Sequence, residues 1–243
     1  RMYRERFFEE YGELVICYDS KHYWRRDIFP QYKAGRKKTR DSSSHDWNDI
    51  FEFLNAFKDE MIEFMPYKVL EVYGAEADDI IYTLTHEFEY DSGKTLILSG
   101  DKDFIQLQRY KNVTQYSPIT KKFIDGMVWN EYLDEHILRG DTSDGVPNVL
   151  SPDNTFVDGL RQRPLGKKKI QSWVEHNIED VLPNDEVKRN FQRNKKLIDL
   201  TEAPQELFSE ITWKEAKTNP RSKLLNYFIQ NRLSDLMDCI GDF

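Results

Sequence analysis

The sequence predicts an α/β fold, with a parallel-sheet layer in the first two-thirds of the chain and an α-rich last third. Short apolar runs, such as residues 14–17, alternate with segments whose apolar residues recur every three or four positions. This alternation of strand and helix patterns is typical of a parallel sheet. Beyond residue 128 only helical spacing continues, so we expect two regions, 1–127 and 128–243.

The predicted elements follow in order along the chain. The patterns favour strands within 12–20, 68–74, 94–104, 112–118 and 121–125, the last two as a hairpin. They favour helices over 47–65, 77–89 and 129–139, and near 167–177, 185–198 and 222–238. Ser44 or Asp46 would cap the first helix, and Gly140 would end the third.

The composition excludes several classes of protein. The chain has 243 residues, 39% hydrophobic and 32% charged, and no apolar run is long enough to span a bilayer. The first ten residues mix charges with aromatics and do not resemble a signal peptide. Two cysteines outside any Cys-x-x-Cys or Cys/His cluster argue against a disulfide framework and a zinc site. The chain begins at Arg1 instead of Met, which leaves open whether a segment precedes it.

The charge is unevenly distributed. The whole chain carries −8, yet residues 21–40 carry eight Lys or Arg and one Asp, a local charge of +7. An acidic body with one basic segment is typical of a nucleic-acid contact, although a solvated basic loop has the same pattern. The basic segment therefore predicts a phosphate-binding surface or a solvent-exposed loop.

Acidic residues follow three of the predicted strands at the points where these strands end. Because the carboxyl ends of parallel strands share one edge of a sheet, these side chains should converge there. Two more acids lie in a Gly-flanked loop after a helix. The complete set is Asp19, Glu76, Asp78, Asp101, Asp103, Asp141 and Asp144.

Converging carboxylates need positive counter-charge, and hard oxygen ligands suit Mg²⁺ or Mn²⁺. Two such ions about 4 Å apart can clamp a phosphoryl group. The acids and the basic segment together favour metal-dependent cleavage of a phosphodiester. Each acid also has a structural alternative: Asp101 and Asp103 could form an Asx turn with an N-cap, and Asp141 and Asp144 could terminate a turn.

Four stretches in this order, YWRRDIFPQYKAGR, AEADDII, LILSGDKDFIQL and GDTSDGVPN, resemble the 5′-nuclease (flap endonuclease) family. The resemblance runs from about residue 15 to 243. It implies a PIN-like core, a helical arch over 21–45 and a helix–three-turn–helix module in the C-terminal region. It also implies 5′→3′ exonuclease, flap endonuclease and ribonuclease H activity, which removes RNA primers during phage DNA replication in the host cytoplasm.

The family pattern assigns roles to the matching residues. It implies two Mg²⁺ ions, with Mn²⁺ as a substitute, held by the seven acids. Lys33 and Arg36 would approach the scissile phosphate as catalytic residues. The residues expected to bind nucleic acid are Arg25, Arg26, Lys33, Arg36, Lys37, Lys167, Lys168 and Lys169. Tyr23, Trp24 and Tyr32 could stack on a base or pack at the base of the arch.

The chain departs from the family pattern in two places. The family begins with a further strand that ends in a metal-binding Asp, and no such strand precedes Asp19 here. Its Gly-rich turn is also interrupted, since 151–164 separate GVPNVL from LGKKKI, which weakens the expectation of a K⁺ site. The alternative function is therefore a catalytically impaired module that binds branched DNA; a PIN-type endoribonuclease is a second rival.

The acidic triplet Glu76, Asp78 and Asp79 sets a constraint of its own. Residues two apart on a helix point about 200° apart. Glu76 and Asp78 can share a site only if the helix begins at 76–78, with Asp79 stabilising its N-terminus through the helix dipole.

The expected partners are DNA and RNA–DNA duplexes with 5′ ends or flaps. The family also suggests a single-strand-binding protein and a sliding clamp, and no membrane is expected.

Overall fold

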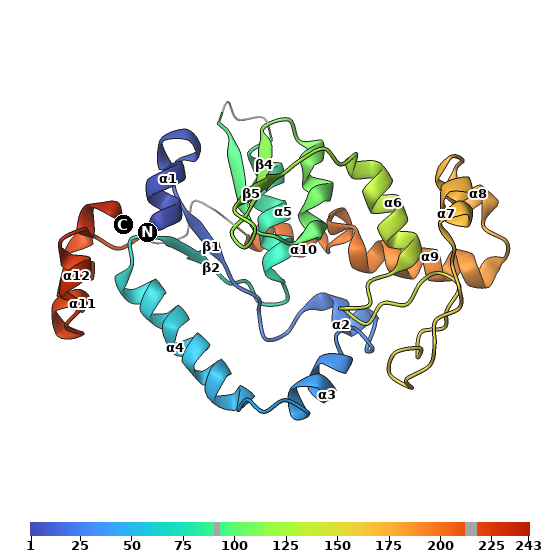
Figure 1. The fold of residues 1–243 in the computed structure, drawn as a ribbon, viewed down its shortest axis with the longest axis horizontal. Helices are drawn as coiled ribbons and strands as arrows, with labels where there is room; N and C mark the ends of the chain where they lie inside the picture. Colours follow the sequence, from blue (N-terminus) through green and yellow to red (C-terminus); the bar gives the residue numbers. More distant parts are fainter. Residues whose placement is uncertain (90–92, 212–217) are drawn as a thin grey trace.

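The computed structural model describes residues 1–89, 93–211 and 218–243 (Figure 1). The strands form two small sheets. Strands β1 (Val15–Cys17) and β2 (Lys68–Leu70) pair in parallel. In the second sheet β3 (Thr95–Leu98) pairs in parallel with β4 (Val113–Ser117), which pairs antiparallel with β5 (Lys122–Ile124). The predicted parallel layer and the hairpin are both confirmed.

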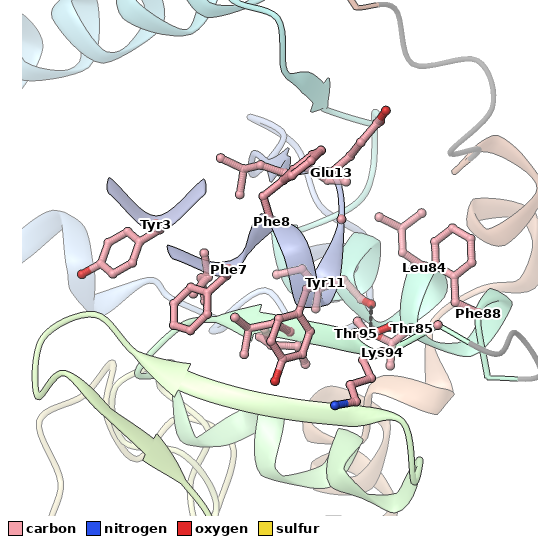
Figure 2. Close-up of a pocket in the computed structure, with 18 of the residues that line it drawn as sticks. Tyr3, Phe7, Phe8, Tyr11, Glu13, Leu84, Thr85, Phe88, Lys94 and Thr95 are labelled. Carbon is pink, nitrogen blue, oxygen red and sulfur yellow. Dashed lines mark hydrogen bonds between the residues drawn. The ribbon is translucent and has the colours of Figure 1, made fainter. Parts of the chain in front are cut away.

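A cavity of about 540 Å³ separates the two sheets (Figure 2). Residues of β1 and β3 line its sides, α5 (Ala77–Glu87) contributes Leu84 and its C-cap residue Phe88 follows, and α1 (Met2–Tyr11) contributes Phe7 and Tyr11. Among the described residues β1 pairs only with β2, and no strand joins it to β3. The described strands therefore form two separate sheets with the cavity between them.

The helices surround these sheets and fill the C-terminal half. Two short helices, α2 (Trp24–Ile28) and α3 (Gly35–Asp41), and the long α4 (Trp47–Phe64) connect β1 to β2. Next come α5, the 3₁₀ helix η1 (Lys102–Arg109) and α6 (Trp129–Arg139). The remainder comprises α7 (Lys167–Val174), α8 (Ile178–Val181), α9 (Asp185–Ile198), η2 (Leu200–Glu202), α10 (Gln205–Glu210), α11 (Arg221–Gln230), α12 (Ser234–Met237) and η3 (Ile240–Asp242). None of the described helices is long and apolar enough to cross a membrane.

Some predicted elements differ in the structure. The prediction of one helix over 222–238 is wrong. The segment forms two helices, α11 and α12, separated by a turn in which Arg232 adopts φ 56°. The strand expected over 94–104 ends at Leu98, and η1 follows it. Helix α1 has no counterpart in the sequence prediction. Asp46, and not Ser44, caps α4 by accepting a hydrogen bond from the backbone N–H of Asn48.

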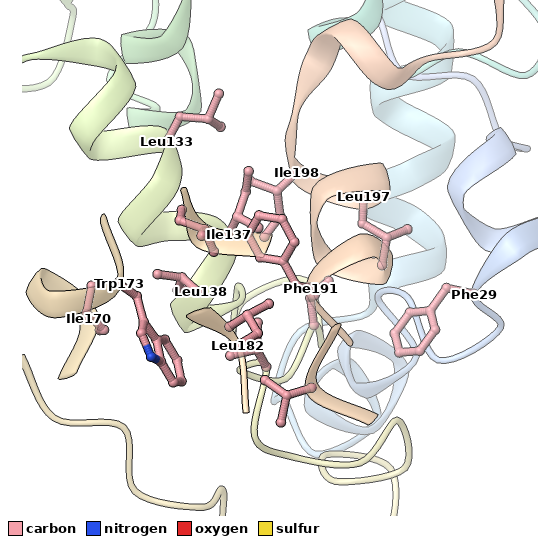
Figure 3. Packing of buried hydrophobic residues seen from close by; sticks show 14 of the residues in the cluster. Phe29, Leu133, Ile137, Leu138, Ile170, Trp173, Leu182, Phe191, Leu197 and Ile198 are labelled. Atoms are coloured by element: carbon pink, nitrogen blue, oxygen red, sulfur yellow. The ribbon is translucent and has the colours of Figure 1, made fainter. Parts of the chain in front are cut away.

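The largest hydrophobic core lies in the C-terminal half and reaches into the basic segment (Figure 3). Leu138 on α6, Trp173 on α7 and Phe191 on α9 pack together in it. Phe29 and Tyr32, from the loop after α2, join the same cluster with exposed fractions of 4% each. This burial anchors the base of the arch to the C-terminal helices and fixes where the arch side chains can reach.

Candidate metal centre

The start of α5 brings several acids together. Glu76 is the N-cap residue in extended conformation, and the Asp79 carboxylate accepts a hydrogen bond from the Glu76 N–H at 2.9 Å, which completes a capping box. Asp19, at the end of β1, accepts a hydrogen bond from the Ala77 N–H at 2.7 Å. The helix therefore begins at Ala77, within the predicted range 76–78. Glu76 stays outside the first turn.

Arg25 lies at the centre of a buried ion network. Its guanidinium donates to Glu76 at 2.9 Å, to both Asp79 oxygens at 2.8 and 3.0 Å, and to the Leu197 carbonyl at 2.8 Å. The side chains of Arg25, Glu76 and Asp79 are exposed by only 2%, 2% and 0%. The expectation that Arg25 contacts nucleic acid does not fit this burial, since its donors face carboxylates inside the protein. Asp79 also does more than favour the helix dipole.

The arch residues Tyr32, Lys33 and Arg36 bring further donors to the same acids. Lys33 forms ion pairs with Glu76 and, at 3.6 Å, with Asp144. Arg36 pairs with Asp144, and the Tyr32 hydroxyl lies 2.8 Å from Asp144 and 3.1 Å from Glu76. Burial would lower the pKa of the Lys33 ammonium, but Glu76 and Asp144 outweigh it and raise that pKa. We call Glu76, Asp79 and Asp144 the cation-paired half of the site.

A second group of acids lies on η1, α5 and the loop after α6. The Asp101 carboxylate accepts a hydrogen bond from the Asp103 N–H at 3.0 Å. One Asp141 oxygen accepts from the Ser143 N–H and hydroxyl, both at 2.7 Å, and from the Asp144 N–H at 3.3 Å. Both turns expected as structural alternatives therefore form, and they orient the remaining oxygens. We call Asp78, Asp101, Asp103 and Asp141 the open half.

The open half has little positive charge of its own, and two of its carboxyl groups have a raised pKa. Burial raises the pKa of Asp78 to about 8, and the nearby Asp103 carboxylate adds to the effect. Burial also raises the pKa of Asp103, although His136 opposes the shift. Carboxyl groups with a raised pKa in a cleft are typical of functional sites, including sites that bind a cation.

The two halves meet at one small cleft. Asp78, Asp103, Asp141 and Asp144 line a cavity of about 10 Å³, next to Arg25 and Tyr32. Such a space holds about one water-sized particle. Carboxylate oxygens from several elements around so small a space fit a hard divalent cation. The convergence expected at the sheet edge is present for these four acids, whereas Asp19 at the α5 N-terminus, Glu76 and Asp101 lie outside the cleft lining.

Sequence reasoning missed one residue of this site, His136. Its Nε2 is 3.2 Å from Asp103 and 3.9 Å from Asp141. The signal available in the sequence was its position at the end of a predicted helix, five residues before Asp141. A helical segment that ends beside an expected ligand can direct its last turn at the same site.

The remaining predicted nucleic-acid residues lie on the surface. Arg26, Arg36 and Lys37 are exposed on α2 and α3. Lys167, Lys168 and Lys169 are exposed in the first turn of α7, after the N-cap Gly166. Of the aromatics at the arch base, Trp24 and Tyr32 are buried with 7% and 4% exposure, which supports packing over base stacking for these two.

Comparison with known proteins assigns the chain. Residues 3–135 match the family described as the 5′-3′ exonuclease N-terminal resolvase-like domain, and residues 132–243 match the family described as the T4 RNase H C-terminal domain. The chain belongs to the 5′-3′ exonuclease family. It is 35% identical over 244 residues to ribonuclease H of Enterobacteria phage T4, covering 96% of this chain and 80% of that protein. This confirms the resemblance seen in the four sequence stretches.

Other members of the family extend the comparison. DNA polymerase I of Bacillus subtilis is 27% identical over 249 residues, which make up 96% of this chain and only 27% of the polymerase. The fold matches a flap endonuclease of bacteriophage T5 in a complex with DNA and metal ions, with a TM-score of 0.62 and 16% identity over 82% of this chain and 81% of that one. The PIN-like α/β core is therefore confirmed.

Proposed function

We propose that this chain is a metal-dependent, structure-specific 5′ nuclease that hydrolyses phosphodiesters near the 5′ ends of RNA primers and DNA flaps. The observation that carries the proposal is the cleft where Asp78, Asp103, Asp141 and Asp144 converge beside Lys33. An acidic cleft alone repels a phosphodiester, so cations must neutralise it before the substrate can enter. The family relationship supports the same activity.

The proposal assigns two Mg²⁺ ions, with Mn²⁺ as a substitute, to the acidic residues, one of them in the cleft itself. Its carboxylates are hard oxygen ligands, and burial raises the pKa of Asp78 and of Asp103. When bound, two such ions polarise the phosphodiester and lower the pKa of water. The chain itself supplies the carboxylates that would hold them and the hydrogen bonds that orient the side chains of Asp101 and Asp141.

The basic side chains bind and orient the substrate in this proposal. Lys33 is protonated next to the cleft. The planar guanidinium of Arg36 pairs with Asp144 in this structure and can bind a phosphate when Asp144 binds a metal ion instead. Exposed Arg26 and Lys37 attract the 5′ strand to the arch. The three lysines in the first turn of α7, a helix that lies beside α6 and α8 (Figure 1), hold the duplex backbone there.

A cleavage assay on a labelled 5′-flap duplex with Mg²⁺ tests the proposal. The Asp101→Asn variant should lose cleavage by a hundredfold or more, on the order of the loss of one electrostatic contact to the transition state, and keep DNA binding. The Asp125→Asn variant, changed on an exposed residue after β5, is the matched control and should cleave normally. Unchanged turnover in Asp101→Asn contradicts the assignment.

A second candidate is a module that binds branched DNA without cutting it. The observation that favours it is the gap between β1 and β3 in the described part of the chain. It predicts flap-selective binding and no divalent-dependent cleavage at any protein concentration. Parallel assays on an RNA–DNA duplex and on single-stranded RNA also separate both candidates from a PIN-type endoribonuclease, which would prefer the single strand.

A further inference from the structure

His136 brings an imidazole nitrogen between two carboxylates of the open half. Nε2 of His136, one oxygen of Asp103 and one oxygen of Asp141 lie within 4.8 Å of one another. The individual distances are 3.2 Å from Nε2 to Asp103 Oδ1 and 3.9 Å from Nε2 to Asp141 Oδ2. Three donors at these separations could face one ion from the same side.

The spacing agrees with coordination geometry. Metal–nitrogen and metal–oxygen bonds are about 2.0–2.2 Å, so ligands in an octahedron lie about 3 Å apart when adjacent and about 4.2 Å apart when opposite. The 3.2 Å from Nε2 to Asp103 matches adjacent ligands, whereas the 3.9 Å to Asp141 lies between the two values, so binding of an ion would bring Asp141 Oδ2 closer to Nε2. Nε2 is shielded from solvent and makes no hydrogen bond of normal geometry, although Asp103 is close. A buried nitrogen of this kind is available to a ligand.

The surrounding residues hold the three donors in place. The His136 ring stacks on Tyr132, one helical turn earlier, with 5.6 Å between centroids and 14° between planes. One oxygen of Asp141 is engaged by Ser143, which leaves Oδ2 toward His136. The backbone of Asp103 is fixed by the hydrogen bond from its N–H to the Asp101 carboxylate.

We propose that Asp103, His136 and Asp141 form a mixed nitrogen–oxygen site that prefers a first-row transition-metal ion such as Mn²⁺ over Mg²⁺. Imidazole is a poor ligand for Mg²⁺, which favours oxygen and keeps its water, whereas transition metals accept both donors. The inference deepens the proposed function, because it names the ion class preferred at one position of the same cleft. Its rival is that His136 is a protonated counter-charge for two carboxylates.

Pulsed electron paramagnetic resonance on the Mn²⁺-loaded full chain tests the proposal without any cleavage step. A ligating imidazole gives a ¹⁴N coupling, which we expect in the unmodified protein and in His176→Gln, a control on an exposed histidine. His136→Gln should lose the coupling. Its Mn²⁺ affinity should fall about tenfold, while its Mg²⁺ affinity changes less than about twofold.

Two results would overturn the proposal. One is the absence of ¹⁴N coupling from Mn²⁺ bound to the unmodified protein, a measurement that needs no variant to fold. The other is full Mn²⁺ affinity in His136→Lys, which keeps a positive charge but cannot ligate while protonated. If the unmodified protein shows the ¹⁴N coupling but does not cleave flap substrates, the proposed function is contradicted and the metal site is still supported.

Discussion

The two halves of the acidic cleft neutralise their carboxylates in different ways. In the cation-paired half, Glu76 and Asp79 share the Arg25 guanidinium, and Lys33 reaches Glu76 from the arch. In the open half, burial raises the pKa of Asp78 and Asp103, and His136 is the basic group that faces Asp103. Permanent cations of the chain neutralise the first half, whereas in the second half burial favours the protonated form of Asp78 and Asp103.

This difference separates the roles of neighbouring residues on one helix. Asp79 and Asp78 are adjacent at the start of α5, yet one is fixed in a buried ion network and the other lines the cleft. A carboxylate with permanent partners stabilises the fold, and one without them is available to a mobile cation. Four variants break or sharpen this comparison, from the largest expected effect to the smallest.

The Arg25→Met variant should have the largest effect. It removes the guanidinium and leaves Glu76 and Asp79 buried, with Lys33 as the remaining cation near Glu76. Breaking one partner of a buried ion network costs about 3–5 kcal/mol. Urea denaturation at pH 7 should show this loss of unfolding free energy. Arg26→Met, on the exposed neighbouring residue, should change stability by less than about 1 kcal/mol; equal losses in both variants would contradict a buried role for Arg25.

The Gly140→Ala variant tests how Asp141 is placed in the open half. Gly140 has φ 68°, and a Cβ there would lie 2.4 Å from the Val146 carbonyl oxygen. Strain and overpacking together should cost about 2–4 kcal/mol. Gly159→Ala is the matched control, because Gly159 has the same φ of 68° with nothing within 4 Å of the added Cβ.

The control should cost about 1 kcal/mol, and the difference between the two variants measures the close approach alone. Thermal denaturation of both proteins gives this difference. If Gly140→Ala is no less stable than Gly159→Ala, the loop that holds Asp141 is free to move away from α6.

The Asp78→Asn variant tests the proton balance of the open half in the metal-free protein. Because the pKa of Asp78 is about 8 in the folded state and near 4 when unfolded, the folded protein holds an extra proton between these values. Stability contributed by this proton is complete below pH 4 and is lost as pH rises to 8, by at most about 1.4 kcal/mol per unit.

In EDTA, the unfolding free energy of Asp78→Asn should fall less steeply with rising pH than that of the unmodified protein. At pH 8 the variant should be the more stable of the two, by about 1–3 kcal/mol. Denaturation curves at pH 5, 6.5 and 8 give the slope, with Asp125→Asn as the surface control. Since Asp103 and His136 titrate nearby in both proteins, only the difference between the slopes reports on Asp78. Parallel slopes would show that Asp78 is ionised at pH 5.

Local chemistry made part of this site predictable. The strand-end acids and the start of α5 at Ala77 follow from strand patterns and from capping chemistry, which involve residues close in sequence. Arg25 and Arg26 look equivalent in the sequence, and only the packing of α2 against α5 buries one and exposes the other. Asp103 lies 33 residues before His136, so their contact depends on how η1 meets α6 and has no local signal.

The Tyr32→Phe variant should have the smallest effect of the four. The buried Tyr32 hydroxyl lies 2.8 Å from Asp144 and 3.1 Å from Glu76, and it can donate one hydrogen bond at a time. Losing it should cost about 1–2 kcal/mol, because Lys33 and Arg36 still neutralise both carboxylates. Tyr73→Phe, at a residue that is 74% exposed, should be neutral in the same urea titration. A loss in Tyr32→Phe as large as that in Arg25→Met would show that the hydroxyl, and not the guanidinium, organises the cation-paired half.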